Sequence, residues 1–193
     1  MEKTISSYTA ALDELNVLMA VSYYSAGGET EQAKRVADDL FSFLVNAYTL
    51  GIEAAAEMLG YDLTVDITKM QSAIFAQIDG KTFEDRAAEH ISAGNLGRLR
   101  TLAESEFHRV FNAAEMDGAQ EFQSCTGRAV MKTWCTMLDE RVRDTHDYLE
   151  GMSVKLENKF YTFDNDCAEY PGGFSKPENN CGCRCVIALK TEV

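Results

Sequence analysis

The placement of proline constrains this chain more than any other feature. Its two prolines are Pro171 and Pro177, so the first 170 of its 193 residues contain none. Proline interrupts helices because it lacks a backbone N–H and its ring clashes with the preceding turn. In the proline-free part, apolar residues recur at helical spacing. The spacing predicts helices over residues 5–25, 31–59, 66–78, 82–93 and 95–117.

Beyond Cys125 the pattern changes to short segments of β character. We expect strands over residues 128–137, 153–156, 160–163 and 183–189. A charged loop with a short helix, residues 139–150, ends at Gly151. The predicted fold class is therefore α+β: an all-helical N-terminal half followed by a small C-terminal module with a short antiparallel sheet. We place the division between a helical interaction region, residues 1–94, and the module, residues 95–193.

Charge limits the partners that we expect. The chain carries 18 basic and 31 acidic residues, a net charge of −13, and both halves are acidic. Proteins that bind nucleic acid tightly present a basic face to the phosphates, so tight nucleic-acid binding is not expected. No apolar run is long enough to span a membrane, and the start lacks the basic and apolar regions of a signal peptide. We therefore expect a cytosolic protein, in which disulfides do not persist.

Three of the six cysteines stand in one short stretch, Cys181-Gly182-Cys183-Arg184-Cys185. On a strand, the three thiols would point to one face. Three interpretations remain open: small buried apolar side chains, a disulfide framework, or a zinc site. The zinc site would use Cys183, Cys185 and His146, with Cys167 or Asp166 as the fourth ligand. The single residue between cysteines is shorter than the spacing of most structural zinc sites, so zinc is a candidate only.

A second group of polar residues follows the strand expected to hold Trp134, which we expect in the core. Asp139, Arg141 and Arg143 alternate, and His146 comes shortly after them. If the chain stays extended, the three alternating side chains share one side, and Asp139 forms a bidentate pair with Arg141 or Arg143. The alternative is a phosphate or nucleotide site with His146 as general acid–base. Neither a nucleophile elbow nor a phosphate-binding glycine loop is present, so we favour the structural interpretation and assign no catalytic residue.

The order of these motifs resembles the phage Mu F-like head-morphogenesis family. The resemblance covers about residues 95–190 and rests on a helix segment, a strand and loop, a turn and a closing segment. These are Ser105-Glu106-Phe107-His108-Arg109-Val110 with Asn112; Trp134, Asp139, Arg141, Arg143, His146 and Gly151; Pro171-Gly172; and Asn180-Cys181-Gly182-Cys183-Arg184-Cys185.

The resemblance implies a phage or prophage minor head protein that acts structurally in head morphogenesis or genome delivery. Its expected partners are portal or capsid proteins, and its expected location is the bacterial host cytoplasm and then the virion interior. The same module also occurs fused to phage-borne toxin domains. The alternatives are therefore a toxin-like enzyme that acts on nucleic acid or a nucleotide through Asp139, Arg141, Arg143 and His146, or a zinc-organised binding module. No cofactor is expected, with zinc kept as a candidate.

Overall fold

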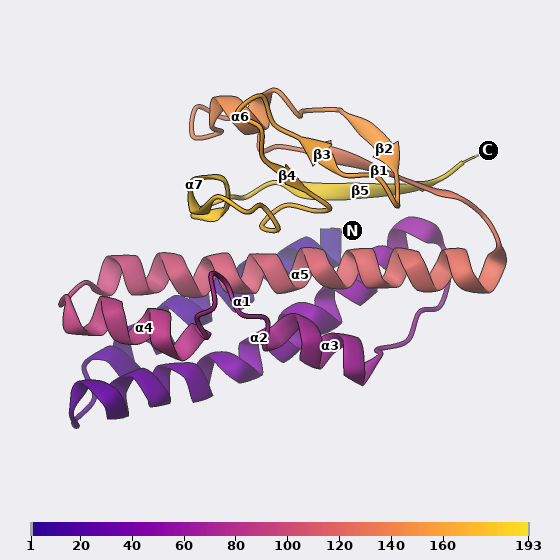
Figure 1. Ribbon diagram of the computed structural model, residues 1–193. Helices are drawn as coiled ribbons and strands as arrows, with labels where there is room; N and C mark the ends of the chain where they lie inside the picture. Colours follow the sequence, from indigo (N-terminus) through magenta and orange to yellow (C-terminus); the bar gives the residue numbers. More distant parts are fainter. Residues whose placement is uncertain (1, 193) are drawn as a thin grey trace.

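A long central helix organises the molecule. The computed structural model describes residues 2–192. In Figure 1 the central helix α5 has the sheet on one side, and α2, α3 and α4 on the other. The helices of the N-terminal part are α1 (Glu2–Tyr23), α2 (Glu29–Leu59), α3 (Ile67–Ile74), α4 (Phe83–Ser92) and α5 (Leu96–Thr126). The predicted α+β fold, with its helical N-terminal half, is confirmed.

Local capping explains where the later helices begin. Thr82 and Asp85 form a capping box at α4, each side chain accepting a hydrogen bond from the other's backbone N–H. The Asn95 side chain accepts a hydrogen bond from the Arg98 N–H at the start of α5. Both helices begin within one residue of their predicted starts, residues 82 and 95. A side chain at such a position satisfies backbone donors that have no partner within the helix.

The predicted end of α5, near residue 117, comes too early in the chain. The helix continues to Thr126 and ends at Gly127, which has a left-handed φ of 68°. Gly118 lies inside the helix and does not end it. A Cβ at Gly118 would lie 2.9 Å from Ala55 Cβ on α2. This glycine therefore permits close approach of two helices.

The C-terminal part contains two small antiparallel sheets. The larger has the order β2-β1-β5, in which Trp134 of β1 pairs with Ile187 of β5. The smaller pairs β3 with β4. The elements are β1 (Val130–Cys135), α6 (Asp144–Asp147), β2 (Ser153–Lys155), β3 (Phe160–Tyr161), β4 (Cys167–Ala168), α7 (Pro177–Asn180) and β5 (Val186–Thr191). The closing strand starts later than predicted, so Cys183 and Cys185 lie in the loop before it.

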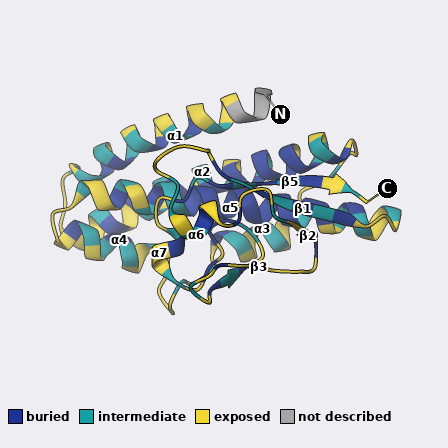
Figure 2. Ribbon diagram, turned by 90° about the horizontal axis from the view of Figure 1, so that it is seen from above, coloured by how far each residue is buried: buried dark blue, intermediate teal, exposed yellow. Residues whose placement is uncertain are grey.

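Two hydrophobic clusters hold these layers together. The first cluster lies among the five helices α1, α2, α3, α4 and α5, and it includes Leu15, Leu40 and Phe107. The second fills the space between α2, α5 and the sheet and includes Phe122 and the fully buried Trp134. Figure 2 shows buried positions concentrated along α2, α5 and the sheet. Burial of apolar surface is the main driving force for such packing, and α5 contributes to both clusters. The division of the chain at residue 94 stays a prediction.

Both edges of the larger sheet are poorly suited to pairing with a further strand. The edge strand β2 is three residues long and carries the exposed Lys155. On the other edge, the Leu189 N–H of β5 donates to Met58 Sδ of α2 at 3.3 Å. Within residues 2–192, no helix combines the length and apolarity that crossing a bilayer requires.

Candidate functional site

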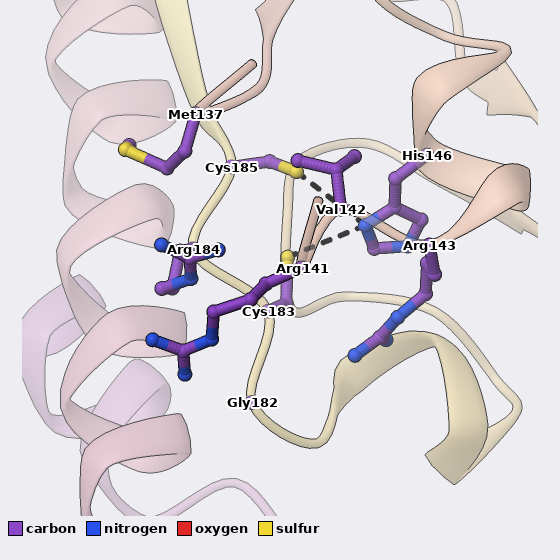
Figure 3. Close-up of a pocket in the computed structure, with 9 residues that line it drawn as sticks. All are labelled: Met137, Arg141, Val142, Arg143, His146, Gly182, Cys183, Arg184 and Cys185. Carbon is purple, nitrogen blue, oxygen red and sulfur yellow. Dashed lines mark hydrogen bonds between the residues drawn. The ribbon is translucent and has the colours of Figure 1, made fainter. Parts of the chain in front are cut away.

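One histidine and two cysteines meet in the C-terminal part. His146 Nδ1 lies 3.5 Å from Cys183 Sγ and 3.4 Å from Cys185 Sγ. All three side chains are buried, and their ligand atoms lie within 4.8 Å of one another. Figure 3 shows both sulfurs directed at the same edge of the imidazole. The structure thus brings together the three residues that the sequence grouped as a candidate metal site.

Aromatic packing fixes the orientation of His146. Its ring stacks on Phe174 with the ring centroids 5.4 Å apart and meets Trp134 edge-on at 5.3 Å. The Asn180 side chain holds Phe174 in place. It accepts from the Phe174 N–H at 3.0 Å and donates to the Phe174 carbonyl at 2.7 Å. The imidazole therefore has little freedom to turn away from the two sulfurs.

A backbone turn directs the side chains of Cys183 and Cys185 toward His146. Gly182 adopts a left-handed φ of 66°, and its N–H donates to Ser105 Oγ of α5 at 3.2 Å. The Cys183 N–H donates to the Asn180 carbonyl at 3.0 Å. Because the chain turns here and becomes a strand only at Val186, Cys181 is exposed and stands apart from the pair. The expectation that all three thiols share one face is wrong for Cys181.

The two sulfurs titrate as a pair. A hydrogen bond from Cys185 lowers the pKa of Cys183, and hydrogen bonds from His108 and His146 lower it further against the effect of burial. The same shared hydrogen bond is the largest cause that raises the pKa of Cys185, and burial adds to it. One sulfur therefore holds a proton while the other favours the thiolate. A thiolate is the form of cysteine that binds metals and acts as a nucleophile.

The space beside this cluster is very small. A cavity of about 10 Å³ is lined by the three residues together with Met137, Arg141, Val142, Arg143, Gly182 and Arg184. Such a volume holds roughly one water molecule. Ligand pockets for drug-sized molecules measure about 300 Å³ or more. The cavity therefore fits an atom-sized ligand and excludes a nucleotide.

Asp139 has a different partner from the one predicted. Its carboxylate accepts from Arg184 Nη1 at 2.8 Å and from Arg184 Nη2 at 2.6 Å. Arg141 contributes only its backbone N–H, at 3.1 Å from Asp139 Oδ1. The predicted pairing with the Arg141 or Arg143 side chain is wrong, because a turn follows Asp139: the Val142 N–H donates to the Asp139 carbonyl at 3.0 Å. The alternation expected of an extended chain is lost there.

Arg143 instead ties two loops together. Its guanidinium donates to the carbonyls of Glu178 and Cys181, each at 2.6 Å. The loop of residues 139–150 then returns to the sheet, where the Gly151 N–H donates to the Trp134 carbonyl at 2.9 Å. Three of the four residues considered for a phosphate site, Asp139, Arg143 and His146, thus have side chains engaged in internal contacts.

The two proposed fourth ligands lie outside the cluster. Among residues 2–192, the group that could hold a metal contains only His146, Cys183 and Cys185. Asp166 accepts hydrogen bonds from the backbone and side chain of Ser175, from the Lys176 N–H and from Asn179 Nδ2. Burial raises the pKa of Asp166, but these hydrogen bonds lower it overall. Asp166 organises the loop that precedes α7 and is not a ligand.

Sequence reasoning missed a second buried polar group, on α5. Glu106 accepts from Arg86 Nη1 and from Arg109 Nη2, each at 2.9 Å. A Cβ at Gly172 would lie 3.2 Å from Arg109 Cα, so the turn at Pro171-Gly172 packs directly on this helix. The three-residue spacing of Glu106 and Arg109 is a usable sequence signal. The contact of Arg86 with Glu106 comes from another helix, so no sequence spacing predicts it.

A larger hollow of about 320 Å³ lies between α2, α3 and α5. Its polar groups are engaged with one another. Asp117 accepts from the Tyr48 hydroxyl at 2.7 Å and pairs with Lys69 Nζ at 3.5 Å, and Glu121 accepts from the Thr64 hydroxyl at 3.0 Å. None of the sequence motifs falls in this hollow.

Comparison with known proteins places the chain in a family. Residues 68–188 match the family described as Phage Mu protein F like protein. The match covers more than half of the chain, and the protein belongs to this family. The matched region begins within α3, upstream of the start at about residue 95 that the sequence motifs indicated, so it also includes α4.

Two curated relatives give the family a context. The chain is 29% identical to the Minor head protein GP7 of Bacillus phage SPP1 over 93 residues, 48% of this chain and 30% of the relative. It is 26% identical to the NAD(+)–arginine ADP-ribosyltransferase EFV of Enterococcus faecalis over 198 residues, 96% of this chain and 38% of the relative. The chain thus spans about a third of the length of these relatives. No solved structure matches it.

Proposed function

We propose that this protein is a minor head protein of a phage or prophage and acts structurally, in head morphogenesis or in genome delivery. Two findings support the class: family membership and the similarity to a minor head protein. One observation carries the structural role. The side chains of Asp139, Arg143 and His146 are engaged in internal contacts, and the cavity beside them measures about 10 Å³. A compact scaffold of this kind offers contact surfaces and little room for a substrate.

The proposed partners are the portal or capsid proteins of the same phage. The protein would be made in the host cytoplasm and then enclosed in the head. Its net charge of −13 is consistent with this location, because an acidic protein is repelled by packaged DNA and is not held on it.

The test is genetic and structural. A phage with a nonsense mutation in this gene is grown with and without a plasmid copy, and gradient-purified heads are analysed by mass spectrometry and electron microscopy. We expect the protein in wild-type heads and a loss of infectivity without it. Aberrant or empty heads would indicate morphogenesis, whereas normal filled heads that fail to infect would indicate delivery. Absence of the protein from heads, with unchanged infectivity, would overturn the proposal.

A second candidate function follows from the similarity to an arginine ADP-ribosyltransferase, which extends over 96% of this chain. In this alternative, the enzyme would bind a nucleotide and act on it through Asp139, Arg141, Arg143 and His146. The geometry disfavours it, because His146 is buried and Arg143 is bonded to two backbone carbonyls. The assay is NAD⁺ consumption by purified protein, with His146→Ala as the matched variant. We expect the wild-type protein to consume no more NAD⁺ than the blank. NAD⁺ consumption by the wild-type protein that is lost in His146→Ala would favour the enzyme.

A further inference from the structure

We propose that His146, Cys183 and Cys185 bind a zinc ion that fastens α6 to the loop before β5. This inference stands on the geometry of the cluster and needs no assumption about head assembly. The ligand atoms are His146 Nδ1 and the two Sγ atoms, and all three side chains are buried.

The spacing of the atoms matches a tetrahedral site. Zinc bonds of about 2.3 Å to sulfur and about 2.05 Å to nitrogen give an N···S edge of about 3.6 Å and an S···S edge of about 3.8 Å. The observed N···S distances are 3.5 and 3.4 Å, and the sulfurs lie within 4.8 Å of each other. The two N···S edges of a zinc site are therefore already present to within about 0.2 Å.

The donor set also fits. Two thiolates and an imidazole are ligands that zinc prefers over harder cations. Two thiolates neutralise the charge of the ion, and Arg143 and Arg184 line the same cavity. With Nδ1 bound to the ion, the proton of the imidazole sits on Nε2, which is buried and has no hydrogen-bond partner among the described residues. Stacking on Phe174 and the contact with Trp134 orient the ring in place of such a partner.

The fourth position would be taken by solvent. The adjoining cavity of about 10 Å³ has room for roughly one water molecule. His108 of α5 also interacts with Cys183, but its two ring nitrogens contact the Tyr8 hydroxyl at 2.9 Å and Asn112 Nδ2 at 3.2 Å. We therefore assign three protein ligands.

The consequence for the fold is a link between distant parts of the chain. His146 and Cys183 are 37 residues apart in sequence. The loop between Cys135 and β2 and the loop before β5 are otherwise joined by the Asp139–Arg184 pair, by Arg143 and by the Thr145–Asn179 hydrogen bond. A structural zinc ion contributes folding free energy directly, because the unfolded chain lacks a preformed site.

The experiment uses the full chain, purified under reducing conditions from medium that contains zinc. Metal content is measured by plasma mass spectrometry, and Co²⁺ is titrated into metal-free protein while its absorption is recorded. We expect about one equivalent of zinc per chain, a thiolate-to-cobalt charge-transfer band with tetrahedral d–d bands, and a lower melting temperature after chelation. Cys183→Ser, Cys185→Ser and His146→Ala should each lose at least 10-fold in zinc affinity.

Two matched controls come from the same chain. Cys125 and Cys181 are exposed and stand outside the cluster, so Cys125→Ser and Cys181→Ser should keep the metal. If a ligand variant fails to fold, the cobalt spectrum of the wild-type protein still decides the question. Folded wild-type protein that gives no thiolate band with excess Co²⁺ overturns the proposal. So does equal loss of metal in a control variant, or a Cys183–Cys185 disulfide, 2 Da lighter, in protein kept under reducing conditions.

Discussion

At the scale of single residues, Glu115 is a buried carboxyl whose burial carries an electrostatic cost. It lies on α5 with 3% of its surface exposed, and its Oε2 has no hydrogen-bond partner among the described residues. Burial raises the pKa of this carboxyl well above its usual range. Because the folded state then binds the proton more tightly than the unfolded state, wild-type stability falls as the pH rises above about 4.3, the ordinary pKa of glutamate.

We predict that Glu115→Gln stabilises the protein at neutral pH. Glutamine has the same shape and does not titrate, so it removes the cost of a buried charge or of the proton taken up to avoid it. The gain should be about 1–3 kcal/mol in the free energy of unfolding at pH 7 and should vanish near pH 4. Urea denaturation at several pH values measures it. The exposed Glu53 on α2 provides the control, since Glu53→Gln should change little at any pH.

The residue types of the cluster could be predicted from the sequence, but their partners could not. Cysteine and histidine are the usual zinc ligands, so Cys183, Cys185 and His146 could be grouped without a structure. The partner of Asp139 is Arg184, 45 residues away. Only the antiparallel pairing of β1 with β5 brings these two residues together, and a local turn removes the nearer candidates. Pairs so distant in the chain leave no trace in sequence spacing.

At the scale of elements, the packing of α2 on α5 depends on small residues. A Cβ at Gly51 of α2 would lie 2.3 Å from the Phe111 carbonyl oxygen and 2.7 Å from Ala114 Cβ on α5. Such distances are too short for the backbones to remain where they are. Apolar periodicity in the sequence predicted both helices but ended α5 near residue 117, before Thr126.

We predict that Gly51→Ala destabilises the protein by about 1–3 kcal/mol, because the two helices must move apart. Gly97, exposed in the first turn of α5, provides a control for which we expect the opposite change in stability. A Cβ there would meet Asn95 Oδ1 at 3.6 Å, an ordinary contact, and Gly97→Ala should stabilise by about 0.5–1 kcal/mol through helix propensity. Thermal unfolding of both variants tests the pair, and a Gly51→Ala protein as stable as Gly97→Ala would contradict the close packing.

At the scale of the whole molecule, the acidic charge sets the response to DNA. With a net charge of −13, we predict no tight binding to duplex DNA at about 150 mM salt, where fields are screened beyond about 8 Å. Fluorescence anisotropy with a labelled duplex measures this, and lowering the salt should not produce binding, because repulsion then grows. A dissociation constant below about 1 µM at this salt concentration would contradict the prediction, since nonspecific binding is usually weaker.

The edges of the larger sheet have a further consequence for this protein at high concentration. A neighbouring chain can extend a sheet only along an edge whose backbone groups are free and whose strand is long enough. Here β2 is three residues long, and an outward N–H of β5 is already engaged by Met58 on α2. Crowded copies should therefore resist strand exchange and fibre growth.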